Sequence, residues 1–165
     1  MTHFLYREQA EEAVRLVAQP LLDSFVANNL TGGREAIHVV LIDPSSPLFE
    51  PRILFEVTVG AIPEGKEYVE IARQKAFEAW REQCDTRELV RFYPHLLMDG
   101  DVLYSGGVFR HRLACGVSGL PSAWDEVIGA ASIESCRAIC FVNSEAVIAD
   151  EDAPLFLPNS TPMAA

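Results

Sequence analysis

The sequence predicts an α+β domain in which an antiparallel sheet of about five strands is flanked by helices. Three observations support this prediction. The 165 residues suffice for one domain with a single core. The spacing of apolar residues along the chain predicts the order helix, two strands, helix, two or three strands, helix. Consecutive strands are joined by short links, which is typical of antiparallel pairing and not of parallel strands with crossover helices.

The first third of the chain is expected to form one helix and two strands. Apolar residues recur every three or four positions over 4–28, which predicts a helix that Pro20 should kink or split. Residues 36–42 are apolar on both faces, as in a central strand, whereas residues 52–59 alternate apolar and polar side chains. Three prolines and two serines predict a loop at 43–51.

The middle of the chain is expected to hold a long helix and a short one. The long helix covers about 65–84 and presents one largely apolar face. Asp85 stands three residues before Glu88, which is the spacing of a capping box, and it predicts a short helix that ends before Pro94.

The following segment is expected to complete the sheet and to lead into the last helix. Residues 102–104 predict a short strand, and two further strands turn at the basic triplet 110–112. The last helix begins after Pro121, where Ser122 and Asp125 have capping spacing. Its inward-facing residues are expected to be Val127, Ile128, Ala131, Ala138, Ile139 and Val142.

The chain is expected to divide into one domain and a tail. Residues 1–143 carry all the predicted helices and strands and form the single domain. Residues 144–165 are acidic and contain three prolines, at 154, 158 and 162. This composition predicts a C-terminal tail that is loose or wraps a partner.

The charge of the chain narrows the choice of partners. The net charge of −11 argues against nucleic acid, whose phosphates require clustered Lys and Arg, and against docking on anionic lipid. No apolar run reaches the roughly 18 residues of a membrane span, and the N-terminus lacks a basic leader followed by an apolar core. We therefore expect a cytoplasmic protein whose four cysteines are reduced and buried.

Short motifs resemble those of the haem-degrading-domain family, which includes the GlcG-like and HbpS-like proteins. Residues 40–43, Val-Leu-Ile-Asp, are similar to the end of the family's first strand, and Lys75-Ala76 is similar to a step in its second helix. Gly106-Gly107 and residues 116–119, Gly-Val-Ser-Gly, resemble its Gly-Gly hairpin and Val-Ser-Gly turn. The resemblance covers about residues 4–143 and is greatest to a short cytosolic branch of the family.

This resemblance implies a profilin-like fold, in which an antiparallel sheet lies between helices, and it implies assembly into homo-oligomers. Some members of the family bind haem or related tetrapyrroles. The resemblance therefore makes haem a possible cofactor, although the cofactor itself stays unknown. The expected ligand is a tetrapyrrole or a small acid.

Lys75 and Ser118 are the first two candidates for ligand binding. Lys75 shares an otherwise apolar helix face with Tyr68 and Ile71, so its ammonium must snorkel, pair with a carboxylate or have a lowered pKa. It could anchor an acidic group of a ligand, and a purely structural pairing is the alternative. Ser118 precedes the N-terminus of the last helix, which could hold an anion, although Asp125 in the same turn would oppose this.

Arg110 and His111, in the hairpin turn, are the other two ligand-binding candidates. His111 could offer its imidazole to haem iron while Arg110 meets a propionate, and the alternative is a solvated turn. His38 is expected to be a satisfied interior histidine. Cys136 and Cys140 share one side of the last helix, and core packing is favoured over a metal site because no further ligands accompany them.

The predicted function is a homo-oligomeric small-ligand-binding domain whose four candidate residues, Lys75, Arg110, His111 and Ser118, lie near one another at the sheet edge. Two alternatives stay open: an enzyme that degrades haem or processes a small metabolite, and a non-catalytic assembly module. The sequence contains no nucleotide-binding, nucleophile-elbow or zinc-protease motif, so no catalytic residue is assigned.

Overall fold

The computed structural model describes residues 4–150 and 156–157. Of the expected tail, 144–165, the first five residues continue the last helix, which ends at Ile148, and most of the others lie outside the described residues. The elements follow the chain in this order: α1 (Arg7–Ala27), β1 (Ile37–Ile42), β2 (Ile53–Val59), α2 (Tyr68–Glu82), α3 (Thr86–Phe92), a 3-10 turn (Pro94–Leu96), β3 (Gly107–Arg110), β4 (Leu113–Ser118) and α4 (Ser122–Ile148). The α+β class is confirmed.

The sheet is antiparallel throughout, with the strand order β2-β1-β4-β3. The described residues form four strands rather than the expected five, because 102–104 is not a strand. The backbone N–H of Val102 instead donates to the carboxylate of Glu78 on α2. A side-chain acceptor thus takes the hydrogen bond that a strand neighbour would otherwise provide.

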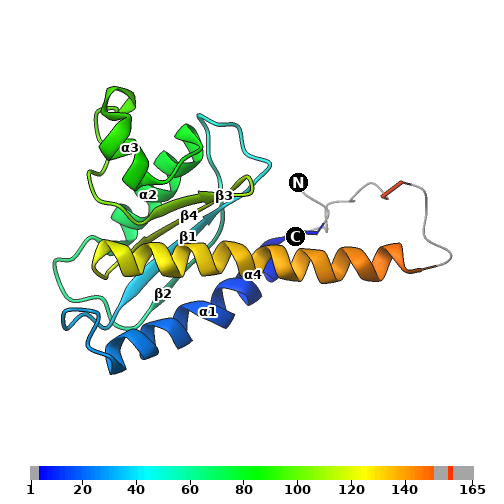
Figure 1. Cartoon of the computed structure of the whole chain (residues 1–165), viewed down its shortest axis with the longest axis horizontal. Coiled ribbons are helices and arrows are strands. Elements are labelled where there is room, and N and C mark those ends of the chain that lie inside the picture. Colours follow the sequence, from blue (N-terminus) through cyan, green and yellow to red (C-terminus); the bar gives the residue numbers. More distant parts are fainter. Residues whose placement is uncertain (1–3, 151–155, 158–165) are drawn as a thin grey trace.

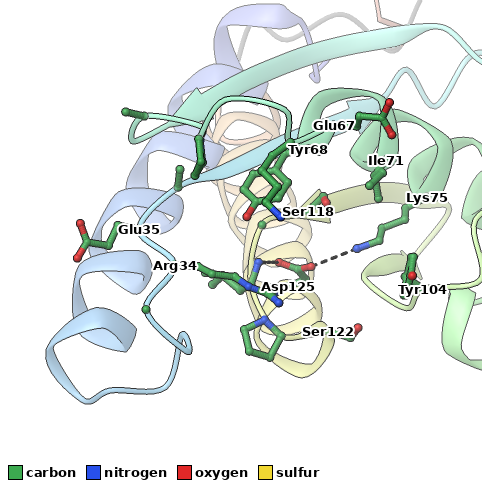
Figure 2. A pocket seen from close by; sticks show the side chains of 18 of the residues that line it. Arg34, Glu35, Glu67, Tyr68, Ile71, Lys75, Tyr104, Ser118, Ser122 and Asp125 are labelled. Atoms are coloured by element: carbon green, nitrogen blue, oxygen red, sulfur yellow. Dashed lines mark hydrogen bonds and ion pairs between the residues drawn. The ribbon is translucent and has the colours of Figure 1, made fainter.

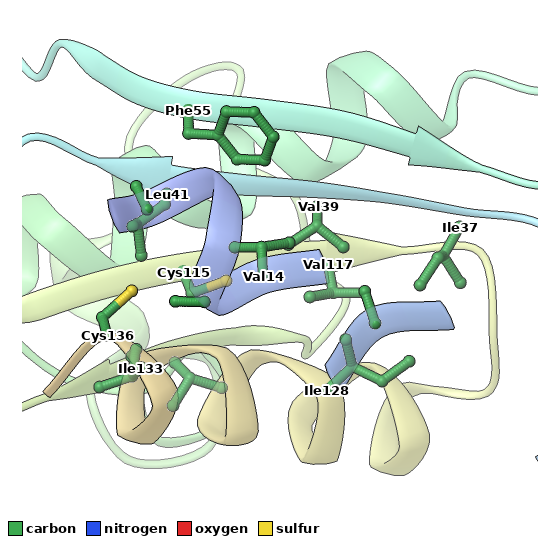
Figure 3. Close-up of a cluster of buried hydrophobic side chains, with 14 of the residues drawn as sticks. Val14, Ile37, Val39, Leu41, Phe55, Cys115, Val117, Ile128, Ile133 and Cys136 are labelled. Atoms are coloured by element: carbon green, nitrogen blue, oxygen red, sulfur yellow. The ribbon is translucent and has the colours of Figure 1, made fainter. Parts of the chain in front are cut away.

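Helices cover both faces of the sheet and make three layers (Figure 1): α1 and α4 lie on one face, and α2 lies on the other. Successive strand residues point to opposite faces, so Val39 and Val117 join the α1–α4 core, whereas Val40 and Ala114 pack against α2. Figure 3 shows the α1–α4 core, where Val14 and Ile128 meet the sheet. Both central strands, β1 and β4, are buried along their whole length.

The α2 layer lies unusually close to β4 because small residues meet there. A Cβ atom at Gly116 would lie 2.1 Å from the carbonyl oxygen of Ala72 and 2.6 Å from the backbone nitrogen of Ala76. A Cβ atom at Gly107, the cross-strand partner of Gly116, would lie 2.4 Å from the carbonyl oxygen of Lys75. The two glycines therefore set the distance between α2 and the sheet, and with it the place of the Lys75 side chain.

Two details of the helices differ from expectation. The helix α1 is unbroken through Pro20, so the predicted split was wrong. Proline has no N–H for the carbonyl of Leu16, but Pro20 and Leu16 are both exposed, so water can bind this carbonyl instead. In α4, Ile128 is buried as predicted, but Val127 and Val142 are exposed. Apolar residues surround much of α4, so their spacing does not define one buried face.

Candidate functional site

A pocket of about 790 Å³ opens at the end of the sheet where β4 leads into α4 (Figure 2). Its wall combines the segment before β1, the loop between β2 and α2, the first turns of α2 and the N-terminus of α4. Lys75 and Ser118, two of the four predicted ligand residues, both line it. Segments far apart in the chain thus meet at one concave site, as ligand pockets commonly do.

A buried ion pair forms the floor of this pocket. Lys75 Nζ lies 3.1 Å from Asp125 Oδ2 and donates to the carbonyl oxygen of Val117 at 2.9 Å. The two charged side chains are only 3% and 2% exposed. The other carboxylate oxygen of Asp125 accepts the backbone N–H of Leu120 at 3.0 Å. The expected cap of Asp125 with Ser122 was wrong, because this carboxylate points into the core instead.

Burial shifts the pKa of both partners toward the uncharged pair. Desolvation raises the pKa of Asp125 to about 6, and the nearby ammonium of Lys75 limits this rise. Desolvation likewise lowers the pKa of Lys75, and the Asp125 carboxylate limits that fall. Each charge is thus maintained by the other, which makes the pairing of Lys75 structurally important whether or not it also meets a ligand.

Several polar groups around the pocket have no partner among the described residues. The hydroxyl of Ser118, a residue only 5% exposed, forms no side-chain hydrogen bond there. The guanidinium of Arg34 and the hydroxyl groups of Tyr68 and Ser122 are also unpaired within the described part of the chain. Groups that converge on a cavity without protein partners are available to a bound molecule.

Arg110 and His111 lie elsewhere. The positive φ angles of His111 and Arg112, +53° and +62°, make the two-residue turn of the β3–β4 hairpin. This turn and Ser118 lie at opposite ends of β4, roughly 20 Å apart at the rise of a strand. The structure therefore brings Lys75 and Ser118 together and separates them from Arg110 and His111, so the expected single site of four residues does not form.

Both hairpin residues already have acidic partners. The guanidinium of Arg110 pairs with the carboxylate of Asp85, which also accepts the backbone N–H of Phe109 at 2.9 Å. Asp85 forms no side-chain cap on α3, so the predicted capping box was wrong. His111 Nε2 lies 3.2 Å from Glu134 Oε1, and the His111 side chain is 49% exposed.

His38 is an interior histidine with two partners, as predicted. Its Nδ1 lies 2.8 Å from the Thr58 hydroxyl and its Nε2 lies 3.2 Å from Glu56. Arg73 also binds Glu56 and holds the pKa of this carboxyl at about 2. Burial lowers the pKa of His38. This cluster is a closed network on the α2 side of the sheet and does not line the pocket.

The cysteines follow the predicted packing only in part, because Cys84 and Cys140 are intermediate in exposure. Cys115 and Cys136 are fully buried in the α1–α4 core, Cys140 packs against it, and all four cysteines are free thiols. Within residues 4–150 and 156–157, no group of three or more His, Cys, Asp or Glu side chains is arranged to hold a metal ion.

Glu78 is a buried titratable residue that the sequence analysis missed. It is fully buried on α2, one turn after Lys75; its Oε1 accepts the N–H of Val102, and its Oε2 has no partner among the described residues. Burial raises the pKa of Glu78 to about 7. Only its position on the inner face of α2 could have revealed it, since its partner is a backbone amide 24 residues away.

Substitution of Glu78 by glutamine is expected to flatten the dependence of stability on pH. A folded-state pKa above the unfolded value favours the folded protein at low pH, and this contribution is lost as the pH rises toward 7. The shift from 4.5 to about 7 corresponds to about 3 kcal/mol of unfolding free energy lost between pH 4.5 and pH 8. Urea unfolding of the wild type and of Glu78→Gln at pH 5 and pH 8 measures the difference.

The control for this experiment is Glu88→Gln, at an exposed position on α3. It is expected to keep the wild-type pH dependence. An equal pH dependence in the wild type and Glu78→Gln would show that Glu78 is charged in the folded protein throughout this range.

Comparisons with known proteins agree with this architecture. No protein-family model matches the chain, and no curated protein matches it either. Among solved structures, HbpS is 21% identical, with 81% of this chain and 91% of HbpS covered at a TM-score of 0.54. The Klebsiella pneumoniae protein ORFY, of the DUF336 family, is 14% identical, with 84% and 94% covered at a TM-score of 0.52.

The chain is thus a three-layer α+β domain with a pocket at one end of its sheet. Its fold is the fold of HbpS and of the DUF336 protein. The predicted resemblance to the GlcG-like and HbpS-like proteins is therefore confirmed at the level of the fold. No helix among the described residues is long and apolar enough to span a membrane.

Proposed function

We propose that this chain is a GlcG/HbpS-like, profilin-like domain that binds a small ligand in the pocket floored by the Lys75–Asp125 pair. The observation that supports the proposal most is the pocket itself, where the hydroxyl of Ser118 and other polar groups have no partner among the described residues. A domain that needed the Lys75–Asp125 pair for stability alone would not require an adjoining cavity of about 790 Å³.

The residues around the pocket favour a small acid over haem. No His, Cys or Met lines the pocket, and Tyr68 and Tyr104 are the lining residues of a type that can ligate haem iron. His111 and Arg110, the residues expected to meet haem, lie at the far end of β4 and are paired with carboxylates. A haem group does not fit the residues in the way that the resemblance implied, so we assign no role to haem.

Blocking the pocket tests this function. Ser122 lines the pocket and is partly exposed, whereas the neighbouring Ala123 is exposed and does not line it. We expect Ser122→Trp to abolish the thermal stabilisation produced by small metabolites and Ala123→Trp to retain it, as measured by thermal shift with a panel of pyruvate, lactate, glutarate, benzoate and haemin. A panel without any stabilising compound, or equal behaviour of the two variants, would contradict a ligand site here.

We also propose that the protein is a cytoplasmic homo-oligomer. The C-terminal turns of α4 extend beyond α1 (Figure 1), and they expose Phe141, Val142 and Ile148 by 61%, 62% and 78%. Phe141 and Ile148 lie seven residues apart and so share one helix face, which a second copy of the chain would cover. The cytoplasmic location follows from the four free thiols, which oxidising compartments would tend to pair.

Substitution of Phe141 by glutamate is expected to dissociate the oligomer, because a buried carboxylate at an apolar interface is costly to desolvate. Sedimentation velocity of the wild type and Phe141→Glu measures the change in mass. Phe92→Glu, at an equally exposed phenylalanine on α3, is the matched control and should leave the mass unchanged. A monomeric wild type would overturn the proposal.

A further inference from the structure

We propose that the ligand of this pocket is a small carboxylic acid whose carboxylate binds between the guanidinium of Arg34 and the N-terminus of α4, beside the Ser118 hydroxyl. This inference rests on the proposed function and specifies the chemical class of the ligand. It assigns a binding role to Arg34, which the sequence analysis did not single out.

Arg34 is the arginine that lines the pocket. Seven arginines form ion pairs with carboxylates: Arg15, Arg52, Arg73, Arg81, Arg87, Arg110 and Arg137. Arg34, like Arg7, Arg91 and Arg112, has no such ion pair among the described residues, although Asp and Glu outnumber Lys and Arg by 24 to 13. The charge of Arg34 nevertheless helps to hold down the pKa of Asp125. Its guanidinium lies over the pocket near Asp125 (Figure 2), where a two-oxygen acceptor could meet its planar fork.

Ser118 gives the pocket wall a hydroxyl donor. The residue ends β4 and pairs with His38 across the sheet, so the backbone fixes its position. Its side chain is held in the pocket wall at 5% exposure, and its hydroxyl has no partner among the described residues. A hydroxyl in the wall of a pocket without a protein partner is available to an oxygen of a ligand.

The N-terminus of α4 adds backbone donors. The carbonyl oxygen of Pro121 accepts the backbone N–H groups of Trp124 and Asp125. The backbone N–H groups of Ser122 and Ala123 have no acceptor in the described part of the chain. Unbonded N–H groups and the dipole of this 27-residue helix favour a negative charge in front of it.

Asp125 does not oppose an anion, contrary to the sequence-based expectation. One of its carboxylate oxygens faces Lys75 and the other accepts the Leu120 N–H, so both are directed into the protein. Its charge is balanced by the ammonium of Lys75. The cations Arg34 and Lys66 and the donors of Ser118 and Ser122 are left for a ligand, and the lining also includes the exposed carboxylates of Glu35 and Glu67. Ile71 and Leu120 supply apolar surface for a short carbon chain.

Pairs of compounds that differ only in charge test the carboxylate. We expect pyruvate, lactate, glutarate or benzoate to bind in isothermal titration calorimetry at millimolar concentration, and the matching uncharged amide to bind at least about tenfold more weakly, as for the loss of one charged hydrogen bond. Arg34→Gln should weaken the binding of the acid by a similar factor and leave the affinity for the amide unchanged. Arg112→Gln, at the exposed hairpin turn, is the charge-matched control.

The outcomes separate this inference from the proposed function. Three results would overturn the proposed carboxylate ligand while leaving a ligand site in place. They are amides that bind as tightly as the acids, an unchanged affinity of Arg34→Gln for the acid, and inorganic phosphate that binds more tightly than any acid. Failure of every acid, amide and phosphate to bind would overturn both. Thermal unfolding of Arg34→Gln without ligand verifies that the exposed substitution leaves the fold intact.

Discussion

Replacement of Lys75 by methionine is expected to lower the free energy of unfolding by about 3–5 kcal/mol. Methionine fills a similar volume but removes the ammonium that faces Asp125, and this leaves a carboxylate 2% exposed without its counter-charge. The carbonyl of Val117 loses a donor as well. The cost therefore arises mainly from the unpaired partner, not from the lost attraction alone.

Urea unfolding at two pH values measures this effect and its cause. Without the ammonium the pKa of Asp125 should rise further, and a raised folded-state pKa favours the folded protein at low pH. The deficit of Lys75→Met should therefore be smaller at pH 5 than at pH 8. The double variant Lys75→Met/Asp125→Asn should recover most of the stability, because asparagine can still accept the Leu120 N–H. A deficit below about 1 kcal/mol, or no recovery, would show that the pair is not important.

Replacement of Gly116 by alanine is expected to destabilise the protein by at least about 3 kcal/mol, at the upper end of the range for overpacked cores. The added methyl would lie 2.1 Å from the Ala72 carbonyl oxygen and 2.6 Å from the Ala76 nitrogen. Both are backbone atoms of α2 and cannot move by a change of rotamer. The helix would have to shift as a unit away from β4, and Lys75 would move with it.

Gly129→Ala is the matched control on α4. Its nearest contact would be a methyl of Val108 at 3.1 Å, which belongs to a side chain, and alanine is favoured over glycine in a helix by about 1 kcal/mol. We expect this variant to stay within about 1 kcal/mol of the wild type. Thermal and urea unfolding of both variants give the comparison, and equal effects at the two positions would contradict the proposed close contact between α2 and the sheet.

Local patterns were sufficient to predict most of the fold. Apolar residues that recur every three or four positions located the helices, and apolar runs or alternation located the strands 36–42 and 52–59. Short links between strands implied antiparallel pairing. The environment of Lys75 was also predictable, because a lysine on an apolar helix face needs a carboxylate or a path to solvent. The same reasoning identified His38 as an interior residue.

The composition of the site was less predictable, because it depends on contacts between distant segments. Asp85 and Asp125 both have capping spacing, yet each binds a cation on another element, Arg110 and Lys75. The length of β4 separates the hairpin turn from Ser118, and the predicted strand after the turn already implied this separation, which the expected single site overlooked. No local signal marks Arg34 as unpaired, since pairing is a property of the folded protein.

The most direct test of the central claim is the position at which a small carboxylic acid perturbs the protein. Amide and arginine side-chain resonances in 15N-labelled protein, titrated with the tightest-binding acid of the panel, locate the contact. We predict that the shifts concentrate on the Arg34 guanidinium and on the backbone from Ser118 to Ala123, at the mouth of the pocket. Shifts centred on the hairpin turn at His111, or the absence of any shift at saturating acid, would contradict the account.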